Sequence, residues 1–310
     1  MVSVHRPLLK RHIQRIIDQR YLLLLSLPFV IWLIIFRYIP LVGWTMAFQD
    51  YKPQFSFFSQ TWVGFKHFAA LFKAPMFYQA LQNTLGMSIL GLVFGFTTSI
   101  TFAVLMNELR VLHFKRFTQT VSYLPHFVSW VIVANIVTTI LSPTGPINEL
   151  LVQLGILKEP FNFMIQKNLF WWIVVISDIW KETGWNAIIY LAAITGIDAA
   201  IYEAAEIDGV NRMQKIWYIT LPGIKSTIVI LLIMSVGNMI NIGFEKQMLL
   251  GNSVVGTKSL VLDKYALDYG IGLFRYSYGT AIGIFKSVVS IILLIAANTV
   301  AKRVGDERLI

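Results

Sequence analysis

The chain has 310 residues, of which 56% are hydrophobic and 14% are charged, and its formal net charge is +10. A soluble globular domain carries about 25% charged residues, so a single water-soluble core is excluded and a polytopic membrane protein is indicated. The positive charge does not indicate a nucleic-acid partner, because the basic residues lie between apolar segments and do not cluster with aromatic residues on a polar domain.

Six apolar segments predict about six transmembrane helices in one all-α bundle. A hydrocarbon layer about 30 Å thick is crossed by roughly 20 apolar residues in a helix, and only helices or closed barrels satisfy their backbone groups in lipid. The spans are expected near residues 21–48, 81–106, 117–141, 169–194, 226–244 and 276–301. Residues 21–301 then form a single membrane domain between a basic N-terminal segment, 1–20, and a short tail, 302–310.

The first span contains Pro28, Arg37 and Pro40, which predict a kink with Arg37 near a membrane interface. The basic stretch before it resembles a signal peptide. No small-residue cleavage site follows Phe36, so we expect this helix to be retained.

The distribution of Lys and Arg predicts that both termini are cytoplasmic. In that orientation the inner segments carry fourteen Lys and Arg residues, and the longer outer segments carry ten. Such a bias toward the cytoplasmic side sets the orientation of membrane proteins. Aromatic residues in the outer loops are interpreted as an interfacial belt, with contact to an external partner or a sugar ring as the alternative.

The inner loop at 196–222 has the pattern of two short helices set at an angle. Asp198 can cap the first helix, because its carboxylate accepts hydrogen bonds from the free amide groups at a helix start. Gly209 can supply the left-handed turn that ends this helix. Asn211 can cap the second helix, which must stop near Pro222.

The first of these short helices presents a face of small residues that permits close approach by another protein. Ile201, Ala204, Ala205 and Asp208 fall on one side of it at helical spacing. The element is too short and too polar to cross a membrane. Two hypotheses therefore remain open on physical grounds: a docking element that sits in a groove on another protein, or a connector that lies on the lipid headgroups.

The spacing within this loop resembles the EAA loop of ABC importer permeases of the sugar-uptake class. The matching positions are Glu203, Ala204, Ala205, Asp208, Gly209, Leu221 and Pro222. In that family the loop is the coupling helix that docks in a cleft of the cytoplasmic ATPase. Ile216 and Ser226 depart from the family pattern, in which Phe and Pro are common at these two places.

Shorter motifs resemble the branch of these permeases associated with oligosaccharide or polysaccharide-fragment uptake. They begin at Asn83, Tyr123, Trp180 and Asn241. The resemblance implies a cytoplasmic ABC ATPase dimer that binds ATP and Mg, a second and homologous permease subunit, and an extracytoplasmic solute-binding protein, at a bacterial or archaeal cell membrane. This chain is expected to bind no cofactor and to be no enzyme, because it lacks the Gly-x-x-x-x-Gly-Lys-Ser/Thr loop of nucleotide-binding proteins.

Polar residues in the fourth and fifth spans are the candidates for a solute path. Ionisable groups inside a bilayer are costly and by default face a protein interior or a wet cavity. The candidates are Lys181, Glu182, Asn186, Tyr190, Asn238, Asn241 and Glu245. Glu182, Asn186 and Tyr190 share one helix face, and amides, carboxylates and aromatic surface suit a sugar. Structural hydrogen bonds between helices are the alternative interpretation.

Two other function classes fit the sequence less well than an importer subunit does. An ion-coupled secondary sugar transporter would use Lys181, Glu182, Glu245 and Lys286 as a relay, but such folds usually contain internal repeats or paired broken helices, which the sequence does not indicate. A membrane enzyme would need a catalytic nucleophile, base and orienting group, and no such set is visible. Cysteine is absent and the five histidines are scattered, so no catalytic residue or metal site is expected.

Overall fold

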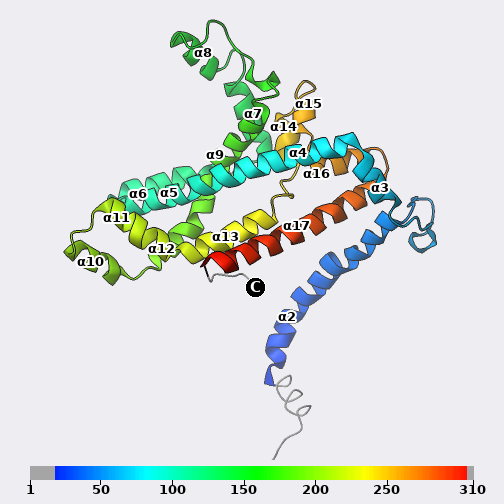
Figure 1. Cartoon of the computed structure of the whole chain (residues 1–310), viewed down its shortest axis with the longest axis horizontal. Helices are drawn as coiled ribbons and strands as arrows, with labels where there is room; N and C mark the ends of the chain where they lie inside the picture. Colours follow the sequence, from blue (N-terminus) through cyan, green and yellow to red (C-terminus); the bar gives the residue numbers. More distant parts are fainter. Residues whose placement is uncertain (1–17, 306–310) are drawn as a thin grey trace, which may run out of the picture.

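The computed structural model describes residues 18–305, and the regular structure in this range is helical (Figure 1). Within the described range, bridged extended backbone is limited to one isolated pair, Gln49 with Trp62. The all-α prediction is therefore confirmed. Most of the predicted basic N-terminal segment and the end of the C-terminal tail lie outside the described residues.

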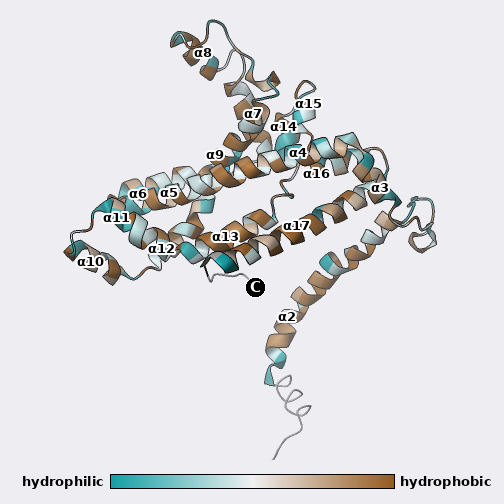
Figure 2. Cartoon of the chain, viewed as in Figure 1, coloured by the Kyte–Doolittle hydropathy of each residue, from teal (hydrophilic) through white to brown (hydrophobic). Residues whose placement is uncertain are grey.

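Long helices carry most of the apolar residues (Figure 2). They are α2 (Arg20–Leu33), α4 (Pro75–Leu90), α5 (Phe96–Glu108), α6 (Leu112–Tyr123), α7 (Trp130–Ile140), α9 (Phe170–Thr195), α13 (Lys225–Gly237) and α17 (Tyr276–Gly305). Shorter helices lie between them: α3 (Lys66–Lys73), α8 (Pro146–Gln153), α10 (Ala199–Ile207), α11 (Arg212–Lys215), α12 (Leu221–Gly223), α14 (Glu245–Leu250), α15 (Gly256–Ser259) and α16 (Leu262–Ala266). Several of these helices continue into π or 3-10 turns: η1 (Ile34–Tyr38), η2 (Ile39–Phe48), η4 (Gly91–Gly95), η5 (Leu124–Phe127), η7 (Ile216–Thr220) and η8 (Leu267–Gly272). Two further 3-10 turns stand alone, η3 (Phe57–Ser59) and η6 (Phe163–Ile165).

Among the described residues, three helical stretches are long and apolar enough by themselves to cross a membrane: Arg20–Phe48, Pro75–Glu108 and Tyr276–Arg303. Three helix pairs meet the same criteria only when each is taken together across a sharp bend: Leu112–Phe127 with Trp130–Ile140 (103°), Phe170–Thr195 with Ala199–Ile207 (71°) and Arg212–Gly223 with Lys225–Gly237 (61°). The number of membrane crossings, up to six, therefore stays a prediction.

The third expected span, 117–141, is not one straight helix. The chain turns by 103° between η5 and α7. Pro125 lies within η5, and the Ser129 hydroxyl accepts a hydrogen bond from the Ile132 amide at the start of α7. A proline followed by a capping serine ends one helix and begins the next, which explains a break inside the predicted span.

The fifth expected span also departs from a single helix, because α13 ends at Gly237 and residues 238–244 are not helical. Backbone of this kind is tolerated at membrane depth only where it is buried in protein or lines a cavity. The end of α13 at Gly237 was not expected from the sequence, in which the apolar run continues to Phe244.

Helix α2 projects away from the other helices (Figure 1). None of its residues is buried, although most of its side chains are large and apolar. Its continuation η2 makes the packing contacts with α17 and α3. A helix that is apolar on all sides and uncovered by the described chain needs lipid or another subunit around it.

Clusters of buried apolar side chains join the remaining helices. One contains Phe77 and Ile282 and joins α4 to α17, and a second contains Phe170 and Leu250 and joins α9 to α14. A third joins α5, α9 and the residues just before α13. Because lipid is as apolar as these side chains, close packing drives their association more than removal from water does.

Helices α6 and α9 are in close backbone contact at Gly184. A Cβ atom there would lie 2.1 Å from the backbone carbonyl oxygen of Ser122, which is an impossible contact. Small residues at helix crossings are typical of membrane bundles. This glycine therefore fixes the depth at which the polar residues of α9 face α6.

Candidate functional site

The loop at 196–222, called the helical loop below, has the local structure that its sequence predicts. The Asp198 carboxylate accepts a hydrogen bond of 2.9 Å from the Ala200 amide and caps α10. Gly209 has a φ of 72°, the left-handed conformation expected at this helix end. Asn211 and Gln214 form a reciprocal capping box at the start of α11. The three local predictions are confirmed.

Side-chain bonds hold the two arms of the helical loop together. Lys215 Nζ lies 2.6 Å from a carboxylate oxygen of Glu206, and the Tyr202 and Thr220 hydroxyls are 2.9 Å apart. The hydrogen bond and positive charge of Lys215 hold the pKa of the Glu206 carboxyl below its usual value. Leu221 packs against the buried cluster of α5 and α9. The loop is thus held together by its own side-chain bonds and packs against the bundle.

The exposed surface of the helical loop is more apolar than the sequence predicted. Ala205, expected on an open face of small residues, is buried, whereas Glu203 is exposed. Ile207 is 88% exposed, and Met213 and Trp217 are each 62% exposed. The loop lies at one end of the bundle, opposite α3 and α16 (Figure 1). Exposed apolar patches are typical of surfaces that contact another protein or a membrane, so both hypotheses for the helical loop remain open.

A central cavity of about 300 Å³ lies among α4, α5, α9, α13 and α14. Polar groups enter it from α4, α9 and α14 and from the residue that follows α13: Ser88, Asp178, Asn186, Tyr190, Gln247 and Asn238. The unwound segment 238–244 contributes Asn238, Met239 and Ile242 to the lining. The broken helix therefore has the location that physical chemistry requires of irregular backbone in a membrane protein.

One face of α9 forms a polar row along the cavity. Glu182, Asn186 and Tyr190 line it as the sequence predicted, and Asp178, one turn earlier, extends the row. Asp178 forms an ion pair with Lys246, with Oδ1 at 2.8 Å from Nζ. The same Nζ lies 5.7 Å from the centre of the Trp130 ring. Sequence reasoning missed Asp178 and Lys246, although the four-residue spacing of α9 pointed to the former.

Lys181 does not line the central cavity but supports its wall. It is buried, with Nζ at 2.5 Å from the His126 carbonyl oxygen and at 3.1 Å from Glu182 Oε1. The other carboxylate oxygen of Glu182 lies 2.7 Å from His126 Nδ1, and the His126 ring stacks on Trp185 with centres 4.3 Å apart. These bonds tie the bend at η5 to α9, so Lys181 has the structural role that was one of the two interpretations.

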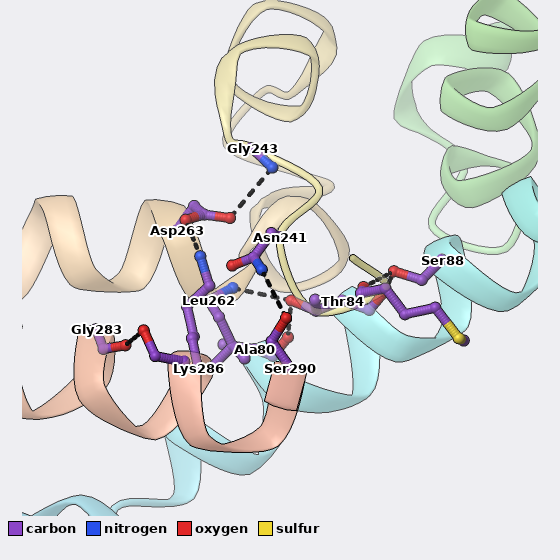
Figure 3. Close-up of polar contacts among 12 residues, drawn as sticks. Ala80, Thr84, Ser88, Asn241, Gly243, Leu262, Asp263, Gly283, Lys286 and Ser290 are labelled. Carbon is purple, nitrogen blue, oxygen red and sulfur yellow. Dashed lines mark hydrogen bonds and ion pairs between the residues drawn. The ribbon is translucent and has the colours of Figure 1, made fainter. Parts of the chain in front are cut away.

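Asn241 and Lys286 belong to a polar network that anchors the unwound segment (Figure 3). Asn241 Nδ2 lies 3.5 Å from the Ser290 hydroxyl of α17, outside the cavity lining. Lys286 pairs with Asp263, whose second oxygen accepts a bond of 3.1 Å from the Gly243 amide. The alternative of hydrogen bonds between helices therefore describes Asn241 better than the solute path does.

The same network reaches α4. Ser88 donates to the Met239 carbonyl of the unwound segment and to the Thr84 carbonyl, and the Thr84 hydroxyl accepts a bond of 2.9 Å from the Leu262 amide (Figure 3). Glu245 has an exposed side chain and does not line the cavity. Of the predicted path residues, the structure thus brings together Glu182, Asn186, Tyr190 and Asn238, and it separates Asn241 and Glu245 from them.

A second opening, called the side pocket below, has a volume of about 410 Å³. It lies between the start of α4 and the segment 247–268, and Gln79, Asn252, Thr257, Lys264 and Asp268 give it a polar lining. Residues 18–305 contain no group of three or more His, Cys, Asp or Glu arranged to hold a metal ion.

Comparison with known proteins identifies the relatives of this chain. Residues 91–306 match the family described as "Binding-protein-dependent transport system inner membrane component". The chain is 43% identical over 299 residues to the polygalacturonan/rhamnogalacturonan transport system permease protein YteP of Bacillus subtilis, covering 96% of this chain and 92% of that protein. It is 29% identical over 273 residues to the arabinooligosaccharides transport system permease protein AraP of the same species, covering 87% and 85%.

Solved structures agree with these relatives. A chain in the crystal structure of a bacterial ABC transporter involved in import of the acidic polysaccharide alginate is 39% identical, with a TM-score of 0.86 over 95% of this chain and 99% of that one. A second structure of a bacterial alginate ABC transporter, in complex with an alginate pentasaccharide-bound periplasmic protein, gives 38% identity and the same TM-score over 96% and 99%. An amino acid ABC transporter matches at 18% identity with a TM-score of 0.51 over 77% of this chain and 99% of that one, a likeness of fold alone.

Proposed function

This chain belongs to the family of binding-protein-dependent transport system inner-membrane components, and on that premise we propose that it is the permease subunit of an ABC importer for fragments of an acidic polysaccharide. It is a membrane channel component and not an enzyme. The observation that carries the proposal is the helical loop, a braced element at one end of an apolar bundle that exposes Glu203 and Ile207. The relatives supply the direction of transport and the class of solute.

The helical loop is the proposed docking site of a cytoplasmic ATPase. Its side-chain bonds, Glu206 with Lys215 and Tyr202 with Thr220, make it move as one body, which is what a coupling element needs. Leu221 connects it to the cluster beneath α13, and α13 leads directly to the cavity. ATP and Mg would bind the ATPase dimer, because this sequence has no nucleotide-binding loop. The end of the bundle that carries the loop then faces the cytoplasm, in the orientation that the Lys and Arg bias predicts.

A second permease subunit is the proposed neighbour of α2. The helix has no buried residue and lies apart from the bundle, so a homologous subunit can pack against it as well as lipid can. A pathway between two such subunits would place the central cavity on their shared axis. An extracytoplasmic binding protein would deliver solute to the opposite end, and the related alginate ABC transporter forms a complex with an alginate pentasaccharide-bound periplasmic protein.

The central cavity is the proposed solute path. Four of the residues predicted for it line the cavity: Glu182, Asn186, Tyr190 and Asn238. Two relatives, at 43% and 39% identity, are described as transporters of polygalacturonan/rhamnogalacturonan and of alginate. Oligogalacturonates are therefore the first solutes to test, and neutral arabino-oligosaccharides are the second, because the relative AraP is more distant.

The docking role is tested by purifying the complex from its native host with the chain either unchanged or carrying Glu203→Arg. We expect the unchanged chain to bring down an ABC ATPase, a second permease and a binding protein, and the variant to lose the ATPase. Glu149→Arg reverses an exposed charge on α8 and is the matched control. Retention of the ATPase and of ATP-driven uptake by Glu203→Arg would refute the docking role.

The ion-coupled alternative is not supported by the arrangement of its four relay residues. Lys181 is paired with Glu182, Lys286 is paired with Asp263, and Glu245 is exposed on α14. The described contacts do not join these groups into one chain. The family match decides between the two transporter classes.

A further inference from the structure

Gln247 on α14 is a buried polar side chain without a bonding partner. The residue is 0% exposed, and neither its amide nitrogen nor its amide oxygen has a hydrogen-bond partner among the described residues. The only other such atom on a buried side chain in this range is Gln49 Oε1. Native proteins bond nearly all buried polar groups, and each exception calls for an explanation.

The location of Gln247 supplies an explanation. Gln247 is the one residue of the described chain that belongs to the linings of both the central cavity and the side pocket. The unpaired amide therefore stands in the wall that separates two polar spaces of about 300 and 410 Å³. An apolar side chain would close this wall without leaving polar atoms unbonded.

The neighbours of Gln247 hold it at this wall without using its amide. Lys246, the preceding residue, is engaged by Asp178 of α9, and the helix α14 follows the unwound segment that Ser88 and Asp263 anchor. The backbone around Gln247 is thus held by contacts from Asp178, Ser88 and Asp263, while the Gln247 amide forms no hydrogen bond. This combination is typical of a side chain whose partner is a ligand.

We propose that Gln247 is a saccharide-contacting residue at the passage between the side pocket and the central cavity, so that an oligosaccharide enters from the pocket side and bonds this amide on its way in. A primary amide offers two donors and an acceptor with two lone pairs, which matches adjacent sugar hydroxyls or a hydroxyl beside a uronate. The inference rests on the proposed function, since it needs a saccharide as the solute, but it assigns a contact and a route that the proposed function does not.

The first test replaces Gln247 by Leu in the complete importer complex in proteoliposomes, with the binding protein and a defined oligogalacturonate as solute. The Leu side chain fills similar space and removes the unbonded atoms, so the midpoint of thermal unfolding should stay equal or rise. Uptake at low solute concentration should fall about 10-fold, the loss expected for one or two hydrogen bonds to the solute. Gln60→Leu is the matched control, because Gln60 is buried, fully bonded and outside both cavities; it should lower the unfolding midpoint and leave uptake per folded complex unchanged.

The second test uses the absence of cysteine from the natural chain. Gln247→Cys is treated with a small water-soluble thiol reagent, and modification of this chain is measured by mass spectrometry. Because residue 247 has no exposed surface in this structure, we expect labelling only while ATP and oligogalacturonate-loaded binding protein drive transport. Ala281→Cys, at a position that is also 0% exposed but lies outside both linings, should stay unlabelled under the same conditions.

The outcomes distinguish the role of Gln247 from the proposed importer function. Normal uptake by Gln247→Leu, or labelling of Gln247→Cys that solute does not affect, overturns the role of Gln247 while uptake by the unchanged complex upholds the proposed function. Failure of the unchanged complex to import any saccharide tested overturns both.

Discussion

The polar cluster that joins α9 to the bend at η5 gives a stability prediction with a definite size. Lys181 is buried, and its ammonium group bonds both the His126 carbonyl at 2.5 Å and Glu182 Oε1 at 3.1 Å. Replacement by Met keeps the length and the apolar stem but removes the charge. Glu182 then keeps His126 as its remaining partner, and the carbonyl oxygen loses its donor.

The expected loss follows from the burial of the two partners. Breaking a buried ion pair by removing one member costs about 3–5 kcal/mol, and the lower end applies because the Glu182 side chain is 28% exposed toward the cavity. At about 2 °C per kcal/mol for a domain of this size, Lys181→Met should lower the unfolding midpoint by about 6 °C. The double variant with Glu182→Gln should recover part of this loss, since it leaves no uncompensated charge.

The assay is thermal unfolding of the purified complex, followed by the fraction that remains monodisperse after heating. Lys52→Met is the matched control, because the Lys52 side chain is 57% exposed and lies 3.9 Å from Asp50; an exposed pair of this kind contributes at most about 1 kcal/mol. An unchanged midpoint in Lys181→Met, or a double variant whose loss equals the sum of the single losses, would refute the reasoning.

Three further predictions concern other parts of the molecule. Gly184→Ala should lower stability by about 1–3 kcal/mol, the cost of overpacking, because the new methyl group would meet the Ser122 carbonyl; an unchanged unfolding midpoint would contradict the close crossing. At Gly209 an added Cβ atom would meet no neighbour, but the φ of 72° is unfavourable for alanine. Gly209→Ala should therefore cost about 1–2 kcal/mol of local stability and weaken ATPase binding in a pull-down. Equal binding would indicate that the turn is dispensable. Asn186→Leu should reduce uptake of oligogalacturonate more than Asn241→Leu does when both are normalised to folded complex, and the reverse order would place the solute path along α17.

The features that the sequence predicted are those determined by residues close together in the chain. Asp198, Gly209 and Asn211 act on amide groups within three residues or on their own φ angle, so their roles in the helical loop could be derived directly. The polar row of α9 was predictable in the same way from its period. Hydropathy alone located the long apolar helices.

The features that were missed depend on contacts between distant segments. The bend after η5 lies within the predicted span 117–141, and the local sequence signal for it was the pair Pro125 and Ser129. Asn241 and Lys246 are near neighbours in sequence, yet the unwound segment turns one toward α17 and the other toward the cavity. A helical period cannot be extended through a segment that is not helical, so the side of the bundle that each residue faces could not be predicted.

The central claim is that energy enters this permease through the helical loop to move an acidic oligosaccharide. The most direct test is ATP-driven uptake into proteoliposomes that contain the complete complex and its loaded binding protein. With labelled oligogalacturonate outside and ATP available to the ATPase, the account predicts accumulation by the unchanged complex and none by the complex with Glu203→Arg. Accumulation that persists without ATP, or that is equal in the two complexes, would contradict it.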